Sequence, residues 1–251
     1  MSPHYSTAFA AVSELDDALR SEMARLYLGS YDGSSEALFL HDLAKKDEVL
    51  LLYADGRLAG FTTLRIFEHN WESRPIRVIY SGDTVVEREH WGQQALAFDW
   101  IARMGTLKRE RPEQRLVWLL LVKGHRTFRY LPLFVKSFHP HWSEQRPDLA
   151  ALADTLAGEM FPGDYNPATG VVEFRQSRGH LKSGIAHPGP AGLNRQDVRF
   201  FLERNPGFQQ GHELVCLCEI EAGNLKPLTL RLFQPAEAFA DADLLPMGAS
   251  L

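Results

Sequence analysis

The sequence predicts an α/β (α+β) fold in which a mixed, mostly antiparallel and twisted sheet is flanked by helices. Two observations carry this prediction. Stretches with the two-residue period of strands alternate with stretches of helical period along the first 140 residues. The segment RLVWLLLV, Arg115 to Val122, is an unbroken apolar run, which is typical of a strand buried on both faces near the centre of a sheet.

The N-terminal region predicts one strand and two helices. Residues 4–12 are expected to form the first strand. A helix is expected from Asp16 to Leu28, because apolar residues recur at helical spacing behind two acidic residues that suit a helix N-terminus. After the break at Gly29 to Gly33, serine caps predict a second helix from Glu36 to Lys45.

A hairpin follows, and it is the clearest local signal in the chain. The strand Val49 to Ala54 and the return strand Arg57 to Phe67 flank the dipeptide Asp55-Gly56, a combination that favours a tight two-residue turn. The segment HNWESRP is expected to be a loop that leads into a third β segment, Arg77 to Val86.

The next segments switch back to helical period. The helix that begins after Trp91 is expected to end at Gly105. The central strand Arg115 to Val122 follows, and Thr127 to Phe138 is expected to be helical with a local irregularity at Pro132.

Residues beyond about 145 are less regular. They predict helices at Asp148 to Met160 and Gln196 to Glu203, strands at Gly170 to Phe174 and Glu213 to Ile220, and a long loop from Ser177 to Leu193. The tail from Ala236 onward is expected to be frayed. No linker separates two domains cleanly.

Composition and charge narrow the class of protein. The chain has 251 residues, 45% of them hydrophobic, and a formal net charge of −5, so we expect no general affinity for nucleic acid or anionic membranes. The arginine clusters Arg109 to Arg115 and Arg126 to Arg129 are interpreted mainly as solvated faces. No apolar run is long enough to span a bilayer.

Cysteine usage and the N-terminus favour a cytoplasmic protein. The two cysteines, Cys216 and Cys218, lie on one face of an apolar strand, which suits packing, and no further ligands at zinc spacing accompany them. Their scarcity fits a reducing compartment. The first residues lack the basic start and apolar run of a secretory signal. We expect a soluble protein without a bound metal.

Three segments together resemble the GNAT acyltransferases. The hairpin VLLLYADGRLAGFTTL is similar to the paired strands of that family's sheet. The passage SGDTVVEREHWGQQALAFDWI resembles its fourth strand, phosphate loop and following helix, and LVWLLLVKGHRTFRYLPLFVKSF resembles its fifth strand and fourth helix. The resemblance covers residues 1–145 as an acyltransferase core, and residues 146–251 are expected to be an extension that packs on it and contributes to the substrate pocket.

The resemblance implies a site for a CoA thioester. The phosphates would bind the turn Trp91, Gly92, Gln93, Gln94 and Ala95 at a helix N-terminus, where unpaired N–H groups and the helix dipole attract anions. The backbone of Thr84, Val85 and Val86 would polarise the thioester carbonyl. The loop departs from the family pattern in having a single glycine, and the alternative is that Gly92 is simply a turn residue ahead of a helix.

Two side chains are candidates for proton transfer. Asp83 lies in an otherwise uncharged stretch beside Gly82 and is a candidate base for the acceptor amine, although an aspartate of a β-bulge would give the same pattern. Tyr130 is the candidate acid for the leaving thiolate, or else a core aromatic residue. It stands one turn before Leu133, the position at which the family carries its tyrosine.

The resemblance implies transfer of an acyl group from acetyl-CoA, another acyl-CoA or an acyl carrier protein to a small-molecule amine, by direct attack in a ternary complex. The alternative is a catalytically degenerate scaffold that binds a ligand or a protein partner. Neither a G-x-S-x-G hydrolase elbow nor a G-x-G-x-x-G dinucleotide motif occurs.

Overall fold

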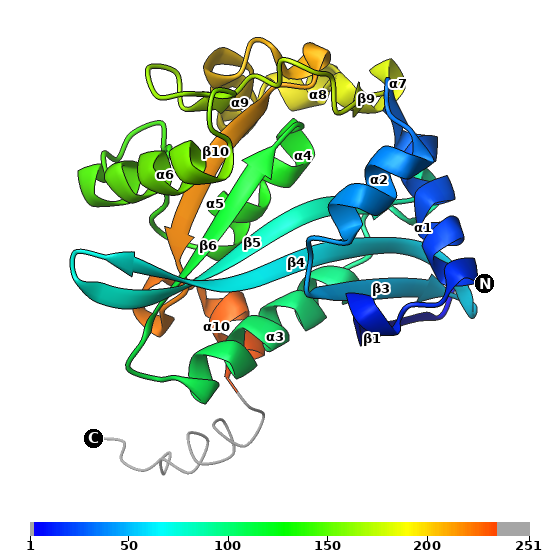
Figure 1. The fold of residues 1–251 in the computed structure, drawn as a ribbon, viewed down its shortest axis with the longest axis horizontal. Coiled ribbons are helices and arrows are strands. Elements are labelled where there is room, and N and C mark those ends of the chain that lie inside the picture. The colour runs from blue at the N-terminus through cyan, green and yellow to red at the C-terminus, as the bar shows by residue number, and fades with distance from the viewer. Residues whose placement is uncertain (1–2, 235–251) are drawn as a thin grey trace, which may run out of the picture.

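A twisted eight-stranded sheet runs through residues 3–234, the part of the chain that this computed structural model describes (Figure 1). Its strand order is β1-β3-β4-β5-β6-β10-β8-β7. The strands are β1 (Tyr5–Ala11), β3 (Glu48–Ala54), β4 (Arg57–Trp71), β5 (Arg74–Val86), β6 (Arg115–Val122), β7 (Tyr165–Asn166), β8 (Val171–Val172) and β10 (Glu213–Glu219). Every neighbouring pair is antiparallel except β5 and β6, which are parallel. A separate antiparallel pair joins β2 (Tyr31–Asp32) to β9 (His180–Leu181).

Helices cover both faces of this sheet. The longer ones are α1 (Asp17–Ser30), α2 (Glu36–Leu43), α3 (Ala95–Glu110), α6 (Pro147–Met160), α9 (Gln196–Arg204) and α10 (Pro227–Phe233). The short ones are α4 (His125–Phe128), α5 (Tyr130–Phe134), α7 (Ser183–Ala186) and α8 (Pro190–Leu193), with 3₁₀ turns η1 (Val12–Glu14), η2 (Arg88–His90), η3 (Phe208–Gln210) and η4 (Ala222–Asn224).

The two faces of the sheet are packed differently. On one face α3, α4, α5, α9 and α10 share a continuous core with residues such as Leu50, Trp118 and Cys216. On the other face there are two separate cores: α1 and α2 cover the β3–β4 side, whereas α6 covers β5, β6 and β10. In Figure 1, α6 on the left and α1 and α2 on the right lie on either side of the ends of β5 and β6. The centre of the sheet lies between these two cores.

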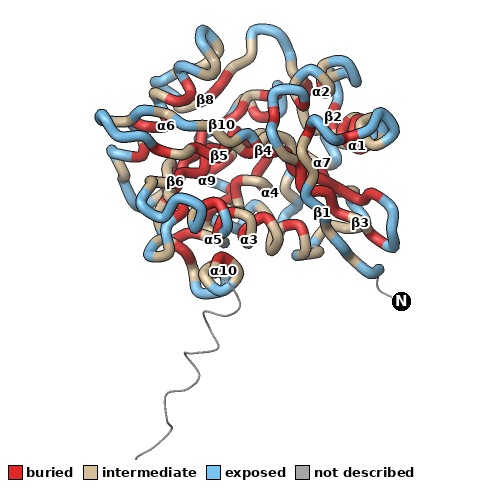
Figure 2. The backbone as a smooth tube through the Cα atoms, turned by 60° about the horizontal axis from the view of Figure 1, so that its bottom comes forward, coloured by how far each residue is buried: buried red, intermediate tan, exposed pale blue. Residues whose placement is uncertain are grey.

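The predicted fold class is confirmed. The strand Arg115 to Val122 has the predicted bounds and is fifth of the eight strands, with Leu119 fully buried and Leu121 nearly so. The buried segments lie along the strands in the interior of Figure 2, with exposed loops around them. In the Asp55-Gly56 turn both residues have positive φ, 50° and 80°, as a two-residue hairpin requires. Cys216 and Cys218 are buried in the core on one face, free and fully covered.

Three local predictions were wrong for reasons that lie outside the local sequence. Gly105 does not end its helix, which continues to Glu110; a β-carbon there would lie 1.9 Å from the carbonyl oxygen of Phe233, so the glycine lets α10 pack against α3. The segment HNWESRP is not a loop but the tip of a second hairpin, in which β4 and β5 pair out to Trp71 and Arg74. The helix expected over residues 127–138 is split into α4 and α5 and ends at Phe134.

Predictions for the C-terminal region held in part. The helix α6 and the strand β10 lie where expected. The strand expected at residues 170–174 is limited to Val171–Val172, and the predicted loop at 177–193 contains β9, α7 and α8. The tail from Ala236 lies outside the described residues. The division of the chain at residue 145 remains a prediction, since β10, from beyond it, pairs with β6 in one sheet. No helix within residues 3–234 is long and apolar enough to cross a membrane.

Candidate functional site

The parallel strands β5 and β6 separate at the centre of the sheet. Their pairing runs from Ile76 opposite Arg115 to Ser81 opposite Leu120 and then stops. Beyond that point β5 pairs only with β4, across a bulge in which Gly82 and Asp83 lie opposite Thr63. A bulge bends its strand and re-aims its side chains, and here it directs β5 away from β6 and opens the sheet.

A cleft of about 1180 Å³ passes through this opening. We call its part beside β5, α3, α4 and α5 the α3 arm, represented by Thr84, Gly92 and Tyr130. We call its part between α1, α2 and the C-terminal segments the α2 arm, represented by Asp83 and Lys123. The two arms lie on opposite faces of the sheet and meet where the strands separate.

In the α3 arm two backbone N–H groups of β5 face the gap. The amide of Glu87 donates to the carbonyl of Ala59 on β4, 2.9 Å away. Because N–H groups alternate sides along a strand, the amide of Val85 also points to β4, where it pairs with Phe61. The amides of Thr84 and Val86 consequently point away from β4, to the side where the described chain supplies no strand. The side chain of Val85 is buried in the core that α1 and α2 form with β3 and β4.

The turn before α3 contains a glycine in the left-handed region of the backbone map. Gly92 has a φ of +92°, and a β-carbon there would meet no atom within 4 Å, so glycine is required by the backbone and not by crowding. The side chain of Gln93 accepts a hydrogen bond from Leu96 N–H at 3.1 Å. Gln94 is the N-cap but provides no side-chain bond, and Ala95 is the first helical residue. The helix N-terminus thus opens into the cleft with N–H groups still free.

Arginines gather around Trp91 at this end of the cleft. The Arg126 guanidinium stacks on the indole at 4.3 Å and that of Arg88 lies 5.7 Å from it. Burial, with the nearby charges of Arg88 and Arg129, lowers the pKa of Arg126. Arg126 is exposed, as the sequence suggested, but it also lines the cleft with Arg129. Arg129 already has Asp197 as a partner, with 3.6 Å between Nε and Oδ2, so Arg88 and Arg126 are the cations whose repulsion an anion would relieve.

Tyr130 lies in the α3 arm, close to the point where the strands separate. It stacks on Phe134 at 5.3 Å, and both residues line a smaller cavity with Ser81, Thr84 and Thr127. Burial raises the pKa of the Tyr130 phenol, so the hydroxyl keeps its proton at neutral pH. Tyr130 and Asp83 therefore line one cleft from opposite faces of the sheet.

Asp83 is both a bulge residue and a cleft residue, so the two interpretations of its sequence context hold together. It is half-buried at the junction of the arms. Within residues 3–234 its carboxylate receives no hydrogen bond from the protein. Burial raises the pKa of Asp83 to about 6, and the neighbouring Asp42 carboxylate adds to the effect while Lys123 opposes it. Such a pKa suits a base that must exchange a proton near neutrality.

Two buried ion pairs flank Asp83. Lys46, whose side chain is 2% exposed, pairs with Asp42; a β-carbon at Gly82 would lie 2.5 Å from its Cε, so the glycine makes room for it. Lys123 Nζ lies 3.1 Å from Glu213 Oε1. Burial by itself would favour neutral Lys123, but the Glu213 carboxylate raises its pKa. Lys123 is therefore charged.

Aromatic side chains form the walls of the α2 arm. Tyr31 faces Lys123, with the ammonium 5.2 Å from the ring centroid, and Tyr80 faces Lys46 at 5.3 Å. Burial raises the pKa of both phenols, so they are neutral. Tyr27 stacks on Tyr31 at 4.4 Å. The arm thus combines apolar walls with a polar floor, as small-molecule sites do.

The C-terminal segments close the α2 arm. Phe161, Phe174 and Arg178 line it, and β9 pairs with β2 beside it. The Tyr27 hydroxyl donates to the Arg178 carbonyl at 3.3 Å. Part of the loop at 177–193 therefore lies at the cleft, as its predicted role in the substrate pocket requires; that role itself stays a prediction.

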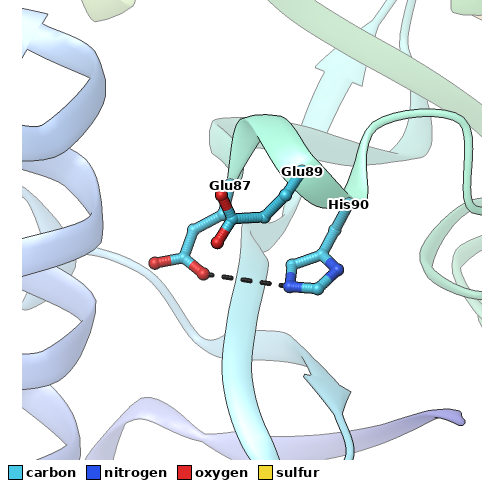
Figure 3. Close-up of side chains that lie close together, drawn as sticks. All are labelled: Glu87, Glu89 and His90. Carbon is cyan, nitrogen blue, oxygen red and sulfur yellow. Dashed lines mark ion pairs between the residues drawn. The ribbon is translucent and has the colours of Figure 1, made fainter. Parts of the chain in front are cut away.

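One group of potential metal ligands lies near the cleft. Glu87, Glu89 and His90 offer ligand atoms within 4.8 Å of one another (Figure 3). However, Glu87 lies 3.6 Å from the Arg25 guanidinium and 4.0 Å from His90, whose Nδ1 lies 3.2 Å from the Tyr5 hydroxyl. These contacts account for Glu87 and His90 as a surface ion-pair network, and Glu89 is exposed.

Sequence reasoning found the α3 arm but missed most of the α2 arm. Lys46 stands in the charged run Lys45 to Glu48, whereas Lys123 and Glu213 are single charges beside apolar strands. Nothing local brings these three residues together, because they meet only in three dimensions. A charged residue next to a buried strand, as in Val122-Lys123 and Glu213-Leu214, is the one signal that would have indicated them. His125, just past β6, is buried, and burial lowers its pKa to about 4.

No family model matches the chain, and no curated protein is recognisably similar in sequence. Solved structures do match it. A probable N-acyltransferase from Enterococcus faecalis has 13% identity and a TM-score of 0.40 over 54% of this chain and 33% of that one. A GNAT family N-acetyltransferase from Escherichia coli, in complex with CoA, has 13% identity and a TM-score of 0.37 over 52% and 70%. Arabidopsis thaliana Naa50, with a bisubstrate analogue, has 10% identity and a TM-score of 0.37 over 57% and 93%.

The chain spans only a third of the length of the Enterococcus protein. The matches fall among GNAT acetyltransferases, the family that the sequence resembles, and cover about half of the chain. At these identities and scores the likeness concerns the fold and extends to neither substrate nor activity.

Proposed function

We propose that this protein is an N-acyltransferase that moves an acyl group from an acyl-CoA thioester to an amine. The observation that carries the proposal is the cleft between β5 and β6, which joins a helix N-terminus with free N–H groups on one face of the sheet to a carboxylate with a raised pKa on the other. Two substrates entering from opposite faces would meet at the bulge, as direct transfer in a ternary complex requires.

The α3 arm would hold the donor. Its phosphates would lie at the turn Trp91 to Ala95, on free N–H groups of α3 and beside Arg88 and Arg126. The thioester carbonyl would accept a hydrogen bond from the amide of Thr84 or Val86. A single such donor is worth about 3–4 kcal/mol in the transition state, because the charge on the oxygen grows there. An acyl carrier protein could present the same thioester through the same arm.

The α2 arm would hold the acceptor. Asp83 would take a proton from the acceptor ammonium and pass it to solvent, and the freed amine nitrogen would then attack the thioester carbon, forming the C–N bond while the C–S bond breaks. Asp83 would next take the second proton that the nitrogen loses, which its pKa of about 6 allows once attack has made the nitrogen acidic. The departing thiolate would receive the proton of Tyr130.

The alternative is a scaffold that binds a ligand or a protein partner without catalysis. One contact favours this alternative. The Trp91 indole N–H donates to the Val86 carbonyl at 2.9 Å, so that carbonyl is already bonded and does not accept a hydrogen bond from an amide group of an acyl-CoA extended along β5. The amides of Thr84 and Val86 remain on the same edge, which favours the enzyme.

Thermal unfolding with CoA and acetyl-CoA, followed by thiol release in the presence of amines, tests the proposal. Both nucleotides should raise the unfolding temperature, and thiol release should depend on the amine. Stabilisation without amine-dependent release would support the binding scaffold. An unfolding temperature that neither nucleotide changes would refute the acyltransferase.

A further inference from the structure

The cleft is cationic although the protein is acidic. Eight Lys or Arg side chains line it against four Asp or Glu, whereas the whole chain carries a formal charge of −5. Arg126 and Arg129 lie in the α3 arm, where the proposed donor places its phosphates. The other six cations, Lys45, Lys46, Arg65, Lys123, Arg175 and Arg178, belong to the α2 arm, and so do all four carboxylates.

Ion pairing accounts for six of the ten charges of the α2 arm. Lys46 pairs with Asp42, Lys123 with Glu213, and Arg175 with Asp164. Of the carboxylates, Asp83 is left over. Of the cations, Lys45, Arg65 and Arg178 have no carboxylate within 4 Å in the described part of the chain. In the α2 arm, Asp83 is therefore the unpaired carboxylate. The unpaired cations are exposed Lys45 and Arg65 and half-buried Arg178.

Two of the free cations are held in place by aromatic rings. Arg178 is half-buried and stacks on Phe174 with 4.6 Å between the guanidinium and the ring centroid, and exposed Arg65 stacks on Phe67 at 4.9 Å. Stacking fixes the guanidinium plane and leaves its N–H groups free for a carboxylate or phosphate. A half-buried charge without a partner is costly unless a ligand supplies one.

The backbone around Arg178 is fixed as well. Its carbonyl accepts the hydrogen bond from Tyr27 on α1. The next residue, Gly179, has a φ of +87°, and a β-carbon there would lie 2.8 Å from Ser34 Cβ. Arg178 thus belongs to a packed wall of the arm and not to a free loop. Arg65 lies opposite Tyr80 on the neighbouring strand, so both cations border the same aromatic walls.

We propose that the amine acceptor also carries an acidic group, a carboxylate or a phosphate, that binds Arg178 and Arg65. The ammonium would face Asp83 and the acid would face the two guanidinium groups, with the aromatic walls between them. This inference rests on the proposed acyl transfer for the role of the ligand, but the binding of an amine that bears an acid depends only on the α2 arm.

Matched pairs of amines test it. In the carboxylate arm γ-aminobutyrate is compared with n-butylamine, and in the phosphate arm phosphoethanolamine is compared with ethanolamine. Binding is measured by thermal unfolding and calorimetry with and without CoA, and acetyl transfer is measured by thiol release. At least one acid-bearing amine should bind about tenfold more tightly than the partner that lacks the acid, as expected for charge-assisted hydrogen bonds.

Arg178→Gln and Arg65→Gln should each remove most of that preference. Each should raise KM or Kd for the acid-bearing amine and change little for the amine that lacks the acid. Arg57→Gln is the control, because Arg57 is exposed at the β3–β4 turn and does not line the cleft. The inference would be overturned if the wild-type protein bound amines with and without the acid equally, or if the Gln variants weakened the binding of both alike.

The two proposals fail separately. If CoA neither binds nor supports transfer while the acid-bearing amine still binds and loses affinity in Arg178→Gln, the acyltransferase fails and the anion site stands. If CoA binds and the amine that lacks the acid is the better acceptor, the acyltransferase stands and the anion site fails.

Discussion

The two arms of the cleft are built in different ways. The α3 arm presents backbone: the amides of Thr84 and Val86, the positive-φ turn at Gly92 and the N-terminus of α3. The α2 arm presents side chains, with Asp83, Lys46 and Lys123 contributed by three separate segments of the chain. The first arm suits an invariant ligand with phosphates and amides, since backbone geometry is fixed by the fold. The second can be changed one side chain at a time, as specificity for one acceptor would require.

This difference gives the arms different sensitivities. Substitutions in the α2 arm remove or expose a buried charge, whereas those in the α3 arm mostly leave the backbone donors in place. We therefore expect larger effects in the α2 arm.

The largest effect is expected for Asp83→Asn. Under the proposed mechanism turnover should fall by roughly 10²- to 10⁴-fold, because general acid–base catalysis is lost, and the loss should shrink at high pH as free amine becomes available. In the wild type kcat/KM should rise as the pH passes about 6, where Asp83 ionises. A stable variant with unchanged turnover would assign the base to another group.

The same variant separates catalysis from structure through its stability. The folded-state pKa of Asp83, about 6, lies above its ordinary value of 3.8, so the folded protein holds this proton more tightly than the unfolded chain. Wild-type stability should therefore fall as the pH rises from about 4 to about 6. Asp83→Asn lacks this loss and should be at least as stable at pH 7, measured by urea unfolding; a variant that unfolds would show that the bulge needs the carboxylate.

Next in size is Glu213→Gln, which leaves Lys123 charged and unpaired in the interior. Breaking a buried ion pair costs about 3–5 kcal/mol of unfolding free energy; the value here should lie near the lower end, because both side chains keep about a tenth of their exposure. The variant should also shift the acid limb of kcat/KM to lower pH, because the Glu213 carboxylate raises the pKa of Asp83. Asp32→Asn, an exposed position, should change neither quantity.

In the α3 arm Tyr130→Phe should lower turnover by about tenfold, less than Asp83→Asn, because a thiolate departs readily without full protonation. Binding of CoA should be retained, since the ring and its contact with Phe134 remain. A matched control is Tyr165→Phe, which removes a phenol that lies outside the cleft. Equal turnover in Tyr130→Phe and the wild type would remove Tyr130 from the mechanism.

The smallest effect is expected for Gly92→Leu, which should weaken CoA binding by about fivefold by disturbing the turn at the helix N-terminus. Gly56→Leu is its control: that glycine also has positive φ and open space, but lies in the β3–β4 hairpin. Both variants should lose similar stability, so a specific loss of CoA affinity at Gly92 isolates the phosphate site. Equal CoA affinities in the two would contradict that site.

Local patterns were enough for most elements. The hairpin at Asp55-Gly56 and the buried strand β6 follow from turn chemistry and from two-residue periodicity, which act over a few residues. The failures were tertiary. Gly105 is interior because the carbonyl of Phe233, 128 residues later, comes close to it, and no local pattern contains that contact.

By itself, the sequence determined the fold class and the candidacy of Asp83, because strand-to-helix transitions and an isolated acid in an uncharged strand are visible along the chain. The donor site at Trp91 to Ala95 and the candidacy of Tyr130 depended on the resemblance to the GNAT acyltransferases. Only the tertiary structure decided what surrounds them. It placed Lys123 beside Glu213 and Arg178 beside Phe174, and so set the charge of the α2 arm. The physical reason is that the free energy of a buried charge depends on its neighbours in space, and here those neighbours come from segments up to about 170 residues apart in the chain.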